Sequence, residues 1–269
     1  MNASEIIKRN NVTIVGEGTK TLMLAHGFGC DQQMWRFLTP SLEKDYRLVL
    51  FDYVGSGGSD ITAFDAERYS SVDGYAQDVI EIIDALELKN INMVGHSVSS
   101  NISLIASQAR PKLFDSLIFI CPTPRFLNSP PDYFGGFDQE DIQDLIDLMD
   151  MSYMGFASKL APMVAGEDIN SGLSQELSTS FCAIDPKAAK AFAEATFFAD
   201  CRHLLPLNRH PSLIIQSRFD ALAPEHVGEY MHETMPQSTL RVIEAVGHCL
   251  HMSHPQEVYA AIQDFMIEA

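Results

Sequence analysis

Short apolar runs alternate with longer segments of helical periodicity along much of the chain. Apolar runs of strand length occur at residues 12–15, 21–25, 46–52, 91–95 and 114–121. Apolar side chains at helical spacing follow at residues 32–42, 72–88 and 98–109. This alternation predicts an α/β fold with a mostly parallel sheet.

The pattern changes between residues 124 and 206, where no segment is typical of a strand. Four helical periods occupy residues 139–149, 152–164, 173–183 and 186–199, and the segment is rich in Phe and Met. The alternation then resumes, with strands at 212–217 and 239–244 and helices at 224–235 and 255–267. We therefore predict a core of residues 1–123 and 207–269, with residues 124–206 inserted as a four-helix lid.

The strand at residues 91–95 and the helix at 98–109 are separated by a turn that contains Ser97. Gly95 stands two residues before this serine and has no Cβ to obstruct a sharp turn. Such a strand–turn–helix unit is typical of a nucleophile elbow, although Ser99 occupies the place of the usual second glycine. The free N–H groups of the following helix would stabilise a developing anion.

A candidate acid and a candidate base follow later strands. Asp220 follows the strand at 212–217, and His248 follows the last strand. The order Ser, acid, His is that of an α/β-hydrolase triad, in which His248 would take the proton of Ser97 and Asp220 would orient the imidazole. Asp200, at the end of the lid, is the alternative acid.

A glycine-rich loop follows the strand at residues 21–25. Its sequence His26-Gly27-Phe28-Gly29 suits the second half of an oxyanion hole. We predict that the backbone N–H groups of Phe28 and Val98 bind the oxyanion.

Three histidines raise the alternative of a metal site. His248, His251 and His254 are spaced at three residues, but no helix is predicted there to bring them onto one face. His26 and His96 are expected to orient loop backbone. The glycines at residues 55–58 lack the spacing of a dinucleotide motif, so we expect neither a metal nor another cofactor.

Charge and cysteine usage exclude several function classes. The 269-residue chain carries a formal net charge of −18, which disfavours nucleic acid and anionic membranes as partners. No apolar run is long enough to span a bilayer, and residues 1–5 do not begin a signal peptide. The five cysteines are scattered, which is typical of reduced thiols and predicts a cytoplasmic location.

The motifs together resemble the RsbQ-type α/β-hydrolases, bacterial proteins related to the plant karrikin and strigolactone receptors. The segments that carry the likeness are GFGCDQ (27–32), FDYVGSG (51–57), DGYAQD (73–78), GHSVS (95–99), GGF (135–137), GH (247–248) and MSHP (252–255). Ser99 is usual in the receptor branch, whereas the bacterial branch more often has glycine there.

The resemblance implies slow hydrolysis of a small apolar ester or enol-ether lactone under a four-helix lid. It also implies a signalling role, since bacterial members act with a sensor phosphatase in the stress response. By position, the pocket would be lined by Phe28, Phe126, Phe137, Leu160 and Phe197. Two hypotheses follow: a serine esterase, or a ligand-sensing protein that acts through a protein partner and hydrolyses its ligand incidentally.

Overall fold

Seven strands form a single sheet in the order β1-β3-β2-β4-β5-β6-β7. β1 pairs with β3 antiparallel, and every other pair is parallel. The strands are β1 (Thr13–Val15), β2 (Lys20–Ala25), β3 (Tyr46–Leu50), β4 (Ile91–His96), β5 (Phe114–Ile120), β6 (Ser212–Phe219) and β7 (Ser238–Val246). The predicted α/β class and mostly parallel sheet are confirmed. This computed structural model describes residues 1–268, and residue 269, the last of the predicted core segment 207–269, lies outside it.

Alternate strand residues face two separate helical layers. Leu22 and Leu24 of β2 belong to one core cluster, and Met23 and Ala25 belong to the other. The first cluster packs on α11 (Pro255–Glu268) and α2 (Thr39–Leu42), and the second packs on α3 (Val72–Ala85), α4 (Val98–Ala109) and α9 (Glu225–Thr234). Burial on both faces explains why the central strands read as continuous apolar runs.

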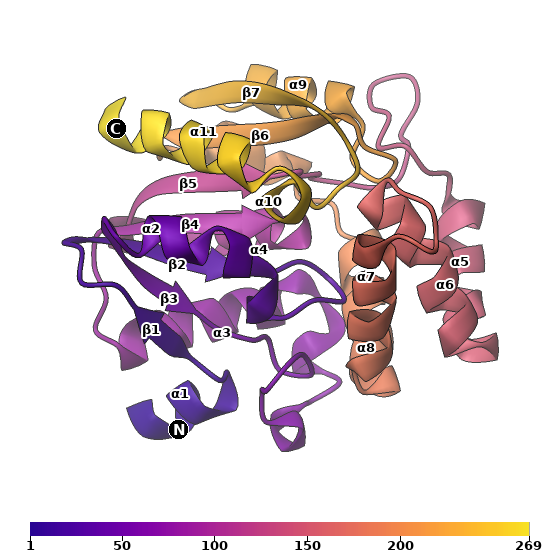
Figure 1. Ribbon diagram of the computed structural model, residues 1–269, viewed down its shortest axis with the longest axis horizontal. Coiled ribbons are helices and arrows are strands. Elements are labelled where there is room, and N and C mark those ends of the chain that lie inside the picture. Colours follow the sequence, from indigo (N-terminus) through magenta and orange to yellow (C-terminus); the bar gives the residue numbers. More distant parts are fainter. Residues whose placement is uncertain (269) are drawn as a thin grey trace.

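The helical lid is inserted between β5 and β6, as predicted. It comprises α5 (Gln139–Met151), α6 (Tyr153–Ala165), α7 (Gly172–Ala183) and α8 (Pro186–Phe197). Figure 1 shows these four helices gathered at one end of the sheet. The Asp185 carboxylate accepts hydrogen bonds from the N–H groups of Lys187 and Ala188, which fixes the start of α8 at Pro186.

Two predicted helices differ from the structure. The single helix expected at 32–42 is a 3₁₀ segment, η1 (Gln32–Phe37), followed by the short α2. Pro40 accounts for the break, because a proline inside a continuous helix lacks the N–H donor and clashes with the preceding turn. The helix expected at 72–88 ends at Ala85, because Glu87 adopts a positive φ of 51°.

Two short helices of the structure are not predicted by the hydrophobic pattern. α1 (Ala3–Arg9) begins with a capping box between Asn2 and Glu5, and its Arg9 pairs with the buried Asp78 of α3 at 3.1 Å. α10 (Leu250–Ser253) is a single turn between β7 and α11. Such short segments hold too few residues for periodicity to show, so capping and tertiary contacts decide them. Among residues 1–268, no helix combines the length and the apolar character needed to cross a membrane.

Candidate active site

Ser97 lies at the turn between β4 and α4 in a strained backbone conformation. Its φ of 55° and ψ of −122° place it outside the regions that a serine usually adopts. A Cβ at Gly95 would lie 2.6 Å from the carbonyl oxygen of Ser99, so this position requires glycine. The N–H of Ser97 donates to the Ile120 carbonyl at 2.9 Å, which ties the turn to the adjacent strand β5. The predicted nucleophile elbow is therefore present.

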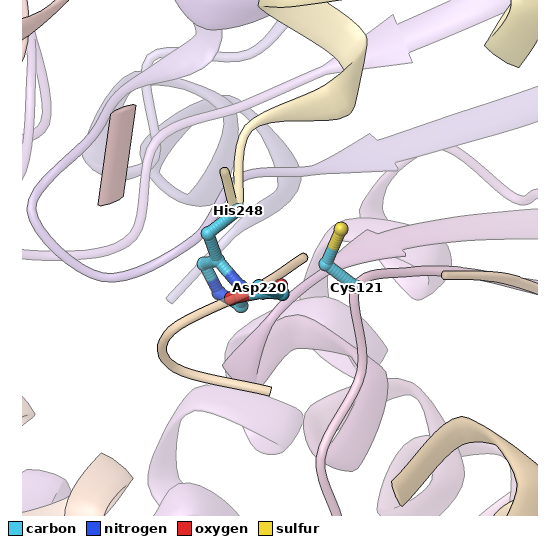
Figure 2. Close-up of side chains that lie close together, drawn as sticks. All are labelled: Cys121, Asp220 and His248. Atoms are coloured by element: carbon cyan, nitrogen blue, oxygen red, sulfur yellow. Dashed lines mark hydrogen bonds and ion pairs between the residues drawn. The ribbon is translucent and has the colours of Figure 1, made fainter. Parts of the chain in front are cut away.

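Ser97, His248 and Asp220 form one hydrogen-bonded chain. His248 Nε2 lies 2.8 Å from Ser97 Oγ, and His248 Nδ1 lies 2.7 Å from Asp220 Oδ2. All three residues are buried. Figure 2 shows the imidazole of His248 directed at the carboxylate of Asp220. This is the geometry of a serine hydrolase triad, with the members in their predicted roles.

The Asp220 carboxylate is itself held by backbone donors. Its second oxygen, Oδ1, accepts hydrogen bonds from the N–H groups of Leu222 and Ala223, at 2.8 and 3.1 Å. Oδ2 is thereby left to face Nδ1 of His248. The arrangement fixes the histidine tautomer, since Nδ1 must carry the proton that the carboxylate accepts.

Asp200, the alternative acid, has different partners. Its carboxylate pairs with Arg125 at 2.6 Å and with Arg202 at 2.7 Å. Hydrogen bonds from Arg202 and Arg125 lower the pKa of Asp200 to about 2, against the desolvation that opposes them. Asp220, not Asp200, is therefore the acid of the triad.

His26 and His96 orient backbone, as expected from the sequence. His26 Nδ1 lies 2.9 Å from the Gly27 carbonyl, and its Nε2 accepts the N–H of Tyr53 at 3.2 Å. His96 Nε2 lies 2.9 Å from the carbonyl of His248, so this side chain supports the catalytic base from behind. Burial lowers the pKa of both imidazoles and keeps them neutral.

Three side chains lie close enough to be considered as metal ligands. Within residues 1–268, the ligand atoms of Cys121, Asp220 and His248 all lie within 4.8 Å of one another (Figure 2). The hydrogen bond between Asp220 and His248 already uses two of these atoms. Burial, with the nearby Asp220 charge, raises the pKa of the Cys121 thiol, and a protonated thiol is a poor ligand. The cluster is thus accounted for by the triad.

The sequence pattern did not indicate that Cys121 lies beside the triad. It follows β5 directly, beside the strands that lead to Ser97 and Asp220. Because the carboxyl ends of neighbouring parallel strands meet at one edge of the sheet, this position could have been predicted to lie near the triad.

A small cavity lies over Ser97, between the core and the lid. Its volume is about 20 Å³, room for about one water molecule and far too little for an ester. The predicted residues Phe28, Phe126, Leu160 and Phe197 line it. Further residues, which the sequence pattern does not indicate, complete the wall: Cys30, Val164, Phe181, Thr196, Leu222 and Cys249. Aromatic side chains nearly fill the space above the nucleophile.

Phe137 does not line this cavity. It lies in an adjacent outer groove of about 330 Å³, and its ring contacts that of Phe126 at a centroid distance of 6.4 Å. The groove and the cavity share Leu160, Phe197 and Leu222, so these three side chains separate the two spaces. Phe137 therefore contacts the cavity wall from outside, through Phe126.

Two backbone N–H groups near Ser97 are free to bind a ligand. Val98 is the first residue of α4, where no intrahelical acceptor is available. Phe28 follows β2 in the glycine-flanked loop. Within the described residues, neither N–H donates to a protein acceptor.

Comparisons with known proteins agree with this geometry. The family model described as "alpha/beta hydrolase fold" matches residues 20–255. A karrikin insensitive 2 receptor of Petunia hybrida is 42% identical over 250 residues, which cover 93% of this chain and 92% of that protein. A strigolactone esterase of Arabidopsis thaliana is 36% identical over 259 residues, covering 96% of both chains. Among solved structures, a hydrolase from Oleispira antarctica is 50% identical, with a TM-score of 0.98 over 100% of this chain and 98% of that one.

Proposed function

The chain belongs to the α/β-hydrolase family, in the group of the karrikin and strigolactone receptors, and from this premise we propose that it hydrolyses small apolar esters or enol-ether lactones. The observation that carries the proposal is the hydrogen-bonded chain from Ser97 through His248 to Asp220, beneath an apolar lid. Ester cleavage is the chemistry that a serine, a base and free backbone donors perform together.

In the proposed reaction, His248 Nε2 accepts the proton of Ser97 Oγ as this oxygen attacks the ester carbonyl carbon. The resulting oxyanion is bound by the N–H groups of Phe28 and Val98, each worth about 3 kcal/mol in such sites. Cleavage of the ester C–O bond releases the alcohol or enol, which takes the proton from His248. Water then attacks the acyl-enzyme by the same route and restores Ser97.

The substrate class follows from the cavity wall. Phe28, Phe126, Leu160 and Phe197 present apolar surface to the ligand, and Phe137 shapes the groove outside. Burying an unpaired charge among these side chains would cost far more than apolar contacts return. The preferred acyl groups are therefore short and uncharged. The small cavity volume requires the lid side chains to move when a ligand enters.

A signalling role forms the second part of the proposal. The relatives reported above are named as a receptor and as an esterase. Because Leu160, Phe197 and Leu222 separate the cavity from the outer groove, a ligand that displaces them alters the lid surface. A protein partner, such as the sensor phosphatase of a stress response, would read that change. In the alternative function, this sensing is the biological output and hydrolysis is incidental.

Labelling of the nucleophile tests the proposed chemistry. A fluorophosphonate probe should label Ser97 alone, and Ser97→Ala should abolish both labelling and hydrolysis of p-nitrophenyl acetate. Ser107→Ala is a matched control, because this buried serine lies near the far end of α4 and its hydroxyl donates to the Leu104 carbonyl. Labelling elsewhere, or full activity of Ser97→Ala, would contradict the proposal.

A second measurement separates hydrolysis from sensing. Ser97→Ala protein is mixed with a small lactone, and hydrogen exchange is followed in α5–α8. If sensing is the output, the lactone changes exchange in the lid of this inactive variant as it does in the wild type. If the output is hydrolysis, wild-type turnover is rapid and the lid of the variant does not respond.

A further inference from the structure

Thr196 contributes an unmet hydrogen-bond donor to the cavity wall. It lies in the last turn of α8 and is only 1% exposed. It lines the cavity above Ser97, and among the described residues its hydroxyl has no hydrogen-bond partner. A buried hydroxyl without a partner has lost its hydrogen bonds to water without replacement, so its presence here calls for an acceptor.

Two other threonines in helices satisfy their hydroxyls within the helix. Thr179 donates to the Gln175 carbonyl at 2.8 Å, and Thr234 donates to the Tyr230 carbonyl at 2.7 Å. The equivalent acceptor for Thr196, the carbonyl of Phe192 four residues earlier, receives no such bond. The hydroxyl of Thr196 is therefore available to a molecule in the cavity.

The remaining polar atoms of the wall are occupied, are acceptors or are only weak donors. Ser97 Oγ and His248 Nε2 bond to each other at 2.8 Å. His96 Nε2 carries the ring proton and donates it to the His248 carbonyl, so its Nδ1, which has no partner among the described residues, is an acceptor and cannot donate to a ligand oxygen. The Cys30 and Cys249 thiols also line the cavity, but S–H is a weak donor. Among the described residues, Thr196 is thus the strong donor that remains for a ligand besides the triad and the oxyanion donors.

We propose that the Thr196 hydroxyl donates a hydrogen bond to a second oxygen of the ligand, separate from the carbonyl that Ser97 attacks. The ligand class is then a small apolar ester or lactone with an additional ether, carbonyl or hydroxyl oxygen. This inference rests on the proposed function for the reacting group. Thr196 belongs to the lid and Ser97 to the core, so the bond also ties the ligand to both layers.

Pairs of esters that differ by one atom test this role. p-Nitrophenyl methoxyacetate replaces one methylene of p-nitrophenyl butyrate by an ether oxygen, and 3-methoxypropionate does the same to valerate one position further on. The ratio of kcat/KM within each pair is compared between the wild type and Thr196→Val. Intrinsic ester reactivity cancels in this comparison, because it is the same for both proteins.

We expect Thr196→Val to lower the ether-to-hydrocarbon ratio about tenfold for at least one pair, because valine keeps the shape of threonine and lacks the donor. Thr196→Ser, which keeps the donor, should restore most of the ratio. Thr179→Val is the matched control, a lid threonine whose hydroxyl already bonds within α7, and it should keep the wild-type ratio. Ratios within twofold of wild type for both pairs, or an equal loss on all four esters, would overturn the inference.

A binding measurement keeps this inference separate from the proposed function. The Kd of each ester is measured by calorimetry on Ser97→Ala protein, with and without Thr196→Val. If the wild type hydrolyses none of the esters, the proposed function fails, yet tighter binding of the ether esters that depends on Thr196 still supports the inference. If the wild type is active and binding shows no dependence on Thr196, only the inference fails.

Discussion

Asp220→Asn should inactivate the enzyme by forcing His248 into the wrong tautomer. In the wild type, Oδ1 of Asp220 accepts two backbone N–H groups, from Leu222 and Ala223, and Oδ2 accepts the Nδ1 proton of His248. An asparagine must keep its amide oxygen on the two N–H donors, because its NH₂ group would oppose them. The NH₂ group then faces Nδ1, which has to become an acceptor.

The size of the effect follows from this exchange. With Nδ1 unprotonated, the imidazole proton moves to Nε2, which lies 2.8 Å from Ser97 Oγ and can no longer accept the serine proton. Loss of the base through the wrong tautomer lowers kcat about 10⁴-fold in serine hydrolases of this mechanism. That loss corresponds to about 5.5 kcal/mol of transition-state stabilisation. The fold should remain, because the Asn side chain keeps the two backbone hydrogen bonds.

The assay is the hydrolysis of p-nitrophenyl acetate by wild type, Asp220→Asn and Asp200→Asn, with thermal unfolding followed by circular dichroism. Asp200→Asn is the matched control, because its carboxylate pairs with arginines on a partly exposed surface. We expect the control to stay within about threefold of the wild-type rate. A loss below tenfold in Asp220→Asn, or a larger loss in Asp200→Asn, would refute the tautomer argument.

Two further substitutions test the cavity and the buried histidines. Phe197→Ala should destabilise the fold by about 3–5 kcal/mol in urea unfolding, and it should shift the preferred p-nitrophenyl ester to longer acyl chains; an unchanged chain-length profile would show that Phe197 does not limit the cavity. Burial, together with the neighbouring His248 and Arg36, lowers the pKa of His251 to about 3. Between pH ~6.5 and 3 the unfolded chain therefore binds a proton at this residue that the folded chain does not, so the free energy of unfolding falls as the pH falls. His251→Phe should reduce the pH dependence of the urea midpoint in that window by the contribution of one proton. The substitution breaks no hydrogen bond, because neither ring nitrogen has a partner among the described residues. An unchanged pH dependence would contradict this.

The sequence alone was sufficient for the fold and for the order of the catalytic residues. Hydrophobic periodicity separates buried strands from helices wherever an element is long enough to repeat, as in β5 and the four lid helices. Gly95 and Ser97 signal the elbow through local backbone sterics, which depend only on neighbouring residues. Asp220 and His248 follow their strands, and carboxyl ends of parallel strands converge on one edge of the sheet.

What the tertiary structure decided concerns contacts between residues that are distant along the chain. The sequence favours Asp220 over Asp200 because it follows a strand, and packing decides between them by directing Asp200 to Arg125 and Asp220 to His248. Phe137 and Phe126 were indistinguishable as lid aromatics, yet only Phe126 lines the cavity. The free hydroxyl of Thr196 depends on a rotamer and on its surroundings, neither of which a one-dimensional pattern encodes. Periodicity reports which face of an element is buried, whereas the partner on that face is set by how the elements pack in three dimensions.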